Sequence, residues 1–283
     1  MGNYANKLSK RFSNRGPDTG FCAICRTHGT LTKDHVPPKD CGNVSDVVIR
    51  DVYGSNLAKQ RGALTSQGGL HFRTICGRCN NTLLGTEYDP ALSAVVQEIQ
   101  SYLTKASGSH LTLPKTQLFE YQPNRFLRSV LGHLLAANAV NDVTKNTPVA
   151  PLDAALRAYV LNSSEVLPDS IHVYYWLYPY RRRVIMKHCG MGFTDSGGNL
   201  IYGHVFKFFP FGFWVVWNEK RISRWSINLP RLGLDTSPFI SATFRLAIDF
   251  LPLQAPDFPE TPPDDGMWLV ADHLIAQAET KAK

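Results

Sequence analysis

Two Cys-x-x-Cys pairs constrain this chain more than any other feature of its sequence. Cys22-Ala-Ile-Cys25 and Cys76-Gly-Arg-Cys79 each have the spacing of a zinc knuckle, and four thiolates complete a tetrahedral zinc site. Six cysteines in 283 residues is far below the density of a disulfide scaffold. We therefore expect the four sulfurs to bind one structural Zn²⁺. A site closed by four sulfurs leaves no position for water, so its role would be structural, and any catalysis needs other residues.

The composition indicates a folded protein that does not cross a membrane. The chain is 43% hydrophobic and 19% charged, which is unlike a disordered chain. Its longest apolar stretch, 206–217, contains Lys207, Pro210 and Gly212, and it is shorter than the roughly 18 to 20 residues that a membrane span needs. The first residues, MGNYANKLSKRF, lack the apolar segment of a secretion signal. We expect a cytoplasmic protein.

The positive charge is concentrated near the amino terminus. The formal net charge is +7, and residues 1–90 hold 12 of the 30 Lys and Arg but 7 of the 23 Asp and Glu. Such a surplus attracts the phosphates of nucleic acid, although a solvated basic surface gives the same pattern. Charge alone therefore favours nucleic acid as the partner without deciding it.

The pattern along the chain predicts an α+β protein with four parts. These are a basic arm (1–20), a small zinc-stapled domain (21–105), a helical connector (106–165) and an α+β domain built on an antiparallel sheet (166–283). Apolar residues at spacings of three and four predict helices over 90–103, 124–140, 151–161 and 267–278. Runs of β-branched and aromatic residues predict strands over 70–75, 171–180, 183–188, 199–209, 212–217 and 221–227. The proline-rich segment 252–266 is typical of an extended surface connection.

Three residues near the cysteines have side chains suited to hydrolysis with a divalent ion. Asp34 and Asn80 offer hard oxygens of the kind that Mg²⁺ or Mn²⁺ prefers. His35 has an imidazole that can take a proton from water near neutral pH. Asn80 directly follows Cys79, so zinc bound to that cysteine would fix the position of the asparagine.

These motifs together resemble the HNH endonucleases of the ββα-metal, or treble-clef, class. The resemblance spans residues 20–92 and consists of the first cysteine pair, Asp34-His35-Val-Pro-Pro, and the second cysteine pair followed by Asn80. It implies hydrolysis of a nucleic-acid phosphodiester at one divalent ion. Asp34 and Asn80 would hold that ion, His35 would be the general base, and the four cysteines would bind zinc. Joined to a C-terminal half of another kind, the module is similar to nucleases of phage defence and mobile elements.

The chain departs from the family pattern in two places. Many members have a further His or Lys where this chain has Leu83 and Leu84. The asparagine that steadies the loop of the base is matched best by Asn56. The loop 41–69 is longer than the motif requires and is interpreted as an insertion that selects substrate. Lys39, Arg73 and Arg78 flank the motif, and we expect them to clamp phosphates.

Two functions remain open on the sequence alone. The first is a metal-dependent endonuclease, with DNA as the expected substrate and RNA as the alternative. The second is a zinc treble-clef protein that binds nucleic acid without cleaving it. In either case the C-terminal domain would recognise a substrate, a trigger, a protein partner or a second copy of the chain.

Several other patterns favour structural roles. The aromatic run 174–180 is interpreted as strand core rather than a base-stacking surface, and His71 as a structural residue. Arg125 and Arg128 are interpreted as a solvated helix face, and Cys41 and Cys189 as free thiols.

Overall fold

The structure is a computed structural model that describes most of the chain. The described residues are 16–50, 64–108, 113–138, 140–146, 148–193, 200–217, 229–232, 241–251, 253–260, 267–271 and 275–280. Within them, no helix combines the length and apolarity that crossing a membrane requires. The predicted basic arm for the most part, Asn56 and the predicted strand 221–227 lie outside the described residues.

The N-terminal part combines a small antiparallel sheet with a long helical segment. Strands β1 (Thr19–Phe21), β2 (His28–His35) and β5 (His71–Cys76) form a sheet in the order β1-β2-β5. The π-type helix η3 (Arg78–Tyr88) begins between the two cysteines of the second pair and continues into α2 (Asp89–Gly108). The second cysteine pair therefore lies where a strand of the sheet gives way to the helix.

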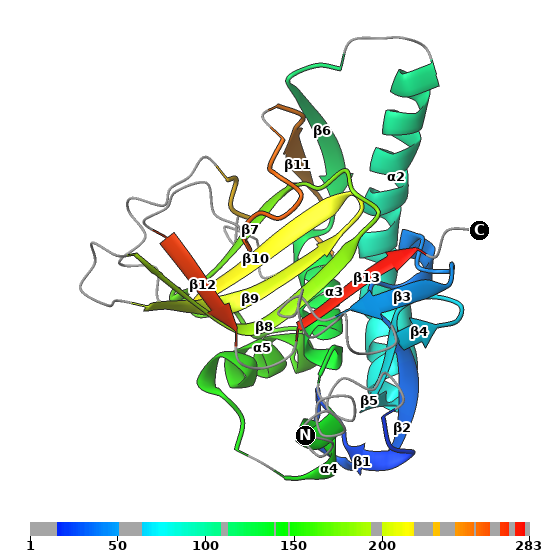
Figure 1. Ribbon diagram of the computed structural model, residues 1–283, viewed down its shortest axis with the longest axis vertical. Helices are drawn as coiled ribbons and strands as arrows, with labels where there is room; N and C mark the ends of the chain where they lie inside the picture. Colours follow the sequence, from blue (N-terminus) through cyan, green and yellow to red (C-terminus); the bar gives the residue numbers. More distant parts are fainter. Residues whose placement is uncertain are drawn as a thin grey trace.

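A second, eight-stranded sheet occupies the centre of the molecule (Figure 1). Its hydrogen-bonded order is β4-β3-β13-β8-β9-β10-β7, and β12 also pairs with β8. All of its printed pairings are antiparallel. The strands are β3 (Val47–Arg50), β4 (Leu64–Ser66), β7 (Ile171–Leu177), β8 (Arg183–Phe193), β9 (Leu200–Phe208), β10 (Phe211–Trp217), β12 (Met267–Ala271) and β13 (Ile275–Thr280).

Helices cover one face of this sheet. The buried helix α3 (Pro123–Ala136) places Phe126 against Phe211 and Phe213 of β10, with ring centroids 5.6 and 5.9 Å apart. Helix α5 (Pro151–Leu161) packs beside α3, and the short α4 (Val140–Thr144) lies next to β1. A two-stranded sheet of β6 (Thr116–Tyr121) and β11 (Phe244–Asp249) lies against α2, where the ring of Phe119 is edge-on to that of Tyr102. Burial of these apolar side chains supplies the main driving force for the fold.

The proline-rich segment packs against the opposite face of the sheet. Phe258 is buried there, edge-on to Trp176 and Trp214. The ammonium group of buried Lys207 donates hydrogen bonds to the carbonyl of Phe258 and to the carboxylate of Glu260, at 2.9 and 2.7 Å. The described part of this segment is therefore held against the sheet by the hydrogen bonds of a buried ammonium group. This differs from the extended surface connection that the sequence predicted.

The α+β class and most predicted elements are confirmed. Helices α2, α3 and α5 and strands β5, β7, β8, β9 and β10 overlap the predicted ranges. The helix predicted over 267–278 is wrong, because the structure has β12 and β13 there. The edge of β8 offers unpaired backbone groups to both segments, and these hydrogen bonds override the local helical pattern.

The loop 41–69 contributes strands to the large sheet. β3 pairs with β4 on one side and with β13 on the other, so a segment from within the first 70 residues shares a sheet with the C-terminal half (Figure 1). The guanidinium group of Arg183 adds a hydrogen bond to the carbonyl of Gly42 at 3.1 Å. The two halves are joined by backbone pairing as well as by side chains.

Two interpretations of single residues can be compared with the structure. The aromatic run 174–180 is mostly strand core, with Tyr175, Trp176 and Tyr178 buried. Arg128 does not belong to a solvated face: it is buried against the ring of Tyr159, and its guanidinium group donates to three backbone carbonyls after α5. The helical periodicity predicted that Arg128 would be exposed to solvent. The three carbonyls take the place of water as hydrogen-bond acceptors, which makes burial of the cation possible.

Candidate metal centre and adjoining residues

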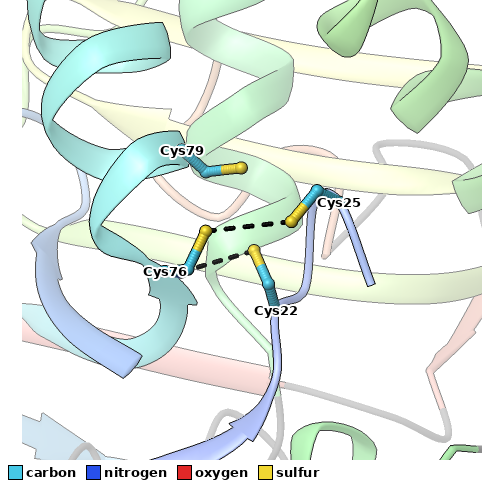
Figure 2. Close-up of side chains that lie close together, drawn as sticks. All are labelled: Cys22, Cys25, Cys76 and Cys79. Carbon is cyan, nitrogen blue, oxygen red and sulfur yellow. Dashed lines mark hydrogen bonds between the residues drawn. The ribbon is translucent and has the colours of Figure 1, made fainter. Parts of the chain in front are cut away.

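The four knuckle cysteines converge on one point. Their sulfur atoms lie within 4.8 Å of one another, and Figure 2 shows the four side chains directed toward a common centre. The Cys25 and Cys76 sulfurs are 3.8 Å apart. A tetrahedron with Zn–S bonds of about 2.3 Å has edges of about 3.8 Å, so this donor set fits zinc. All four thiols are free of disulfide bonds.

The electrostatics of the cluster favour a bound dication. A hydrogen bond from the Cys79 thiol, together with backbone N–H donors, lowers the pKa of Cys22 to about 5. Burial raises the pKa of Cys76, and the hydrogen bond to Cys22 raises that of Cys79. Without metal, one thiolate therefore opposes ionisation of its neighbours. A Zn²⁺ ion would remove that repulsion and hold all four as thiolates.

Backbone hydrogen bonds shape the first knuckle and attach it to β5. The carbonyl of Cys22 accepts from the backbone N–H of Arg26 at 2.9 Å, and Arg26 adopts the left-handed conformation with φ of 62°. The N–H of Ala23 donates to the carbonyl of Thr74 at 2.8 Å. These bonds bring the two cysteine pairs together although they are about 50 residues apart in the sequence.

Asn80 lies against the strand that carries Asp34 and His35. Its side-chain amide donates to the carbonyl of Lys33 at 2.9 Å and to the hydroxyl of Thr32 at 3.0 Å. Because Cys79 belongs to the cluster, the next residue is fixed in the first turn of η3. The carboxamide thus meets the peptide bond immediately before Asp34.

His35 is the last residue of β2 and is half-buried beside His71. Its Nε2 donates to the carbonyl of Gly68 at 3.1 Å, which leaves Nδ1 with the lone pair of a neutral ring. Burial lowers the pKa of His35, and the charge of Lys39 adds to this effect. A neutral imidazole at physiological pH is the form that accepts a proton.

Asp34 faces away from solvent and binds a histidine on α3. Only 3% of Asp34 is exposed, and its Oδ2 accepts from Nδ1 of His133 at 2.9 Å. The Nε2 of the same ring donates to Oδ1 of Asp89 at 2.9 Å, and Ser129 donates to that oxygen at 2.7 Å. The result is a buried chain of Asp34, His133, Asp89 and Ser129.

The charge state of this chain follows from its two carboxylates. Burial alone would lower the pKa of His133, but Asp34 and Asp89 outweigh burial and raise the pKa to about 10. Burial raises the pKa of Asp34, and the neighbouring imidazolium opposes that rise. His133 is therefore a buried cation held between two acidic side chains.

A buried asparagine steadies the loop that follows His35. The side-chain amide of Asn43 donates to the carbonyls of Pro37 and Leu70 at 2.7 and 2.8 Å, and its oxygen accepts from the N–H of Leu70 at 2.8 Å. The N–H of Val36 also donates to the carbonyl of Leu70 at 3.0 Å. Asn43 therefore joins the end of β2 to the start of β5. From the sequence, Asn56, and not Asn43, is matched to the asparagine that steadies this loop.

The three expected phosphate-binding residues are not equivalent. Lys39, four residues after His35, and Arg78, the first residue of η3, are both exposed. Arg73 is half-buried and forms an ion pair with Asp18. Of the three, Lys39 and Arg78 are the more accessible to a phosphate.

Some of the predicted site residues therefore contact one another in the structure, whereas others have separate hydrogen-bond partners. The four cysteines form one cluster, and Asn80 contacts the Asp34-His35 strand. The side chains of Asp34, His35 and Asn80 each have a different hydrogen-bond partner: His133, Gly68 and Lys33. Sequence reasoning missed His133, Asp89 and Asn43; a lone histidine on an apolar helix was the available signal for the first.

Comparisons with protein-family models, with curated proteins and with solved structures found no match for this chain.

Proposed function

We propose that this protein hydrolyses phosphodiester bonds of nucleic acid, with DNA as the expected substrate and a divalent ion as the cofactor. The observation that carries the proposal is the contact between Asn80 and the carbonyl of Lys33, at 2.9 Å. Through it, the residue that follows a zinc ligand meets the strand end that carries a carboxylate and an imidazole. Zinc bound to Cys79 would fix the Asn80 side of this contact, which is how a structural metal prepares a reactive site.

Each side chain has a separate task in this proposal. His35 accepts the proton of the attacking water at Nδ1, because its Nε2 proton is committed to Gly68. Asn80 and Asp34 would supply oxygens to Mg²⁺ or Mn²⁺, which when bound neutralises charge that develops on the phosphate. Lys39 and Arg78 attract and orient the nucleic-acid backbone. The fit of Asp34 requires one carboxylate oxygen to serve the ion while the other accepts from His133.

The test is cleavage of supercoiled plasmid and of single-stranded RNA by the zinc-loaded protein. We expect nicking with Mg²⁺ or Mn²⁺ that EDTA abolishes. Removing a general base costs about 10²-fold to 10⁴-fold in rate, so His35→Ala should lose almost all activity. The matched control is His28→Ala, since His28 is exposed at the other end of the same strand. If the wild type cleaves neither substrate with either ion, the hydrolytic proposal fails.

A second candidate is a nucleic-acid-binding protein that does not cleave. The burial of Asp34 and its hydrogen bond to His133 favour it, because both features suit a structural carboxylate. Under this reading, Asp34→Asn lowers stability, and His35→Ala leaves binding unchanged. Retained DNA binding by wild type without turnover, weakened by Lys39→Gln and Arg78→Gln, would establish the second candidate over the first.

A further inference from the structure

His35 and His71 lie opposite each other on neighbouring strands. They are register partners in the antiparallel pairing of β2 with β5, so their side chains project from the same face of the small sheet. The centres of the two imidazole rings are 5.6 Å apart, and the ring planes are inclined by 44°. The proposed hydrolysis gives a role to His35 and none to His71.

The proton of the neutral His71 ring is placed by its neighbours. Nδ1 of His71 lies 3.1 Å from the hydroxyl oxygen of Ser66 and 3.3 Å from the carbonyl oxygen of Gly69. Ser66 donates its own proton to the carbonyl of Gly69 at 2.6 Å, so both oxygens near Nδ1 are acceptors. Nδ1 therefore carries the ring proton, and Nε2 carries the lone pair.

The lone pair of each ring is available to a ligand. Nε2 of His35 donates to the carbonyl of Gly68 at 3.1 Å, which leaves the lone pair on Nδ1. Among the described residues, neither Nδ1 of His35 nor Nε2 of His71 has a hydrogen-bond partner, and neither is a side-chain nitrogen buried without one. Both unprotonated nitrogens therefore reach solvent.

The hydrogen bonds of both rings are those of histidines that bind metal. A metal-ligating histidine almost always donates its other ring N–H to a carboxylate, a backbone carbonyl or water, which fixes the tautomer and the orientation of the ring. Here the two rings donate toward the carbonyls of Gly68 and Gly69, successive residues of the turn before β5.

The separation of the rings also suits a shared ion. With metal–nitrogen bonds of about 2.1 Å, two imidazoles on one tetrahedral ion have ring centres about 5 Å apart. The observed separation of 5.6 Å between His35 and His71 is close to this value, so a small side-chain rotation is enough to bring both nitrogens onto one ion.

The charges near the pair are mixed and exposed. Asp46 accepts from the backbone N–H of Gly68 at 2.9 Å, which brings an exposed carboxylate to the same turn. Lys33 and Lys39 are also exposed, so water and salt screen their repulsion of a cation. Imidazole nitrogens suit Ni²⁺, Cu²⁺ and Zn²⁺, whereas Mg²⁺ prefers oxygen ligands. The pair therefore selects transition metals.

A second group that contains histidines lacks these features. Ligand atoms of Asp153, His188 and His204 lie within 4.8 Å of one another. The backbone N–H of His188 donates to Nδ1 of His204 at 3.0 Å, so the His204 proton is on Nε2, which lies 2.9 Å from Asp153. The ammonium group of buried Lys187, 3.5 Å from Asp153, would also repel a cation. The tautomers therefore favour the pair of His35 and His71.

We infer that His35 and His71 together bind a divalent transition-metal ion, through Nδ1 of His35 and Nε2 of His71, with water in its remaining positions. This binding follows from the geometry of the two strands and does not require hydrolysis. A second consequence rests on the proposed function. The bound ion occupies the lone pair of His35 that would accept a proton from water, so it inhibits cleavage.

The test is calorimetric titration of the zinc-loaded full chain with Ni²⁺, with the zinc content measured before and after. We expect one Ni²⁺ to bind per chain while the four cysteines retain zinc. His35→Gln and His71→Gln each remove one ligand and should weaken binding at least about tenfold. His28→Gln is the matched control, because His28 is exposed at the other end of β2, and it should leave the affinity unchanged.

NMR of protein with labelled histidines keeps the inference testable if a variant fails to fold. Of the nine histidines, His35 and His71 should be the first whose imidazole signals are broadened by paramagnetic Ni²⁺. The inference is overturned if Ni²⁺ does not bind saturably, if His28→Gln weakens binding as much as His71→Gln, or if other histidines broaden first.

Cleavage assays separate this inference from the proposed function. If the protein nicks plasmid with Mg²⁺, added Ni²⁺ should inhibit it, and His71→Gln should need at least about tenfold more Ni²⁺ for half-inhibition of its own rate. Ni²⁺ binding at the pair without any cleavage would refute the hydrolysis and support the metal site. Cleavage without Ni²⁺ binding would refute the metal site alone, and an unchanged rate with Ni²⁺ bound would refute the inhibition.

Discussion

His133 links two carboxylates that are far apart in the sequence. Asp34 is 99 residues from it and Asp89 is 44, yet each binds one nitrogen of the ring. The imidazolium stabilises both carboxylates in a site that excludes water. This residue therefore connects the strand of the candidate base, the start of α2 and the last turn of α3.

The first prediction concerns the pH dependence contributed by His133. Its pKa is about 10 in the folded protein and 6.5 as an ordinary histidine, so its stabilising contribution is complete below pH 6.5. The unfolded chain loses this proton first as pH rises, and stability falls between pH 6.5 and 10. His133→Gln should be less stable at pH 7 and should remove this part of the slope.

Urea unfolding at pH 7, 8 and 9 measures that slope, with His28→Gln as the control for an exposed histidine. The same loss of stability with rising pH in wild type and His133→Gln would contradict the assignment of a buried imidazolium.

Local spacing predicted the convergence of the four cysteines, because two pairs with knuckle spacing supply a complete set of zinc ligands. The ion-binding role of Asn80 stays a prediction. Local spacing did not predict His133 or Asn43, because their roles depend on contacts made only after folding. Asn43 occurs in a Cys-Gly-Asn turn, where an asparagine has many local uses. Its clamp on Pro37 and Leu70 requires that two distant strands already be paired.

At the scale of elements, η3 and α3 pack closely at one glycine. A methyl group at Gly132 would lie 2.3 Å from a terminal carbon of Leu84 on η3. Gly132 immediately precedes His133, so this close approach also sets the distance from α3 to Asp34. The absence of a side chain here is a packing requirement.

Gly132→Ala should lower the free energy of unfolding by about 1 to 3 kcal/mol through this overlap. Adding Leu84→Ala removes the clashing atoms, so the double variant should lose less than the sum of the single changes. Gly108→Ala is the control, because nothing lies within 4 Å of a methyl group there. Additive losses in the double variant would show that the contact is not limiting.

The elements predicted best were those whose apolar pattern agrees with their packing. The strands β7 to β10 are rich in aromatic and β-branched residues. Strands β8, β9 and β10 are neighbours in sequence order, and β7 pairs with the far side of β10. The segment 267–278 has residues compatible with a helix, and the available edge of β8 decided its structure. Neither that edge nor the pairing of β3 with β13 could be read from local periodicity.

At the scale of the molecule, the part that holds the four cysteines is connected to the large sheet and to the helices that cover it by several interactions. β3 pairs with β13, Arg157 binds Ala23 in the first knuckle, and the Thr74 hydroxyl donates to the carbonyl of Ala136. All five tryptophans occur after residue 170. Their fluorescence therefore reports the C-terminal half, and coupling to zinc can be measured there.

Removing zinc should destabilise the half of the chain that holds no cysteine ligand. Loss of a structural zinc site removes several kcal/mol of binding free energy, so the tryptophan-detected Tm should fall by at least about 10 °C. Cys76→Ser should give the same decrease, and added Zn²⁺ should restore only the chelated wild type. An unchanged tryptophan transition after zinc removal would mean that the two halves unfold independently.

Single-turnover cleavage with chemical rescue tests the central claim most directly. A labelled DNA duplex is incubated with zinc-loaded wild type or His35→Gly, in Mg²⁺ or Mn²⁺, with and without added imidazole. The proposed mechanism predicts cleavage by wild type, a loss of at least about 10²-fold in His35→Gly, and partial recovery with imidazole. Equal cleavage by the two proteins, or no cleavage by wild type, would contradict a role for His35 as the base.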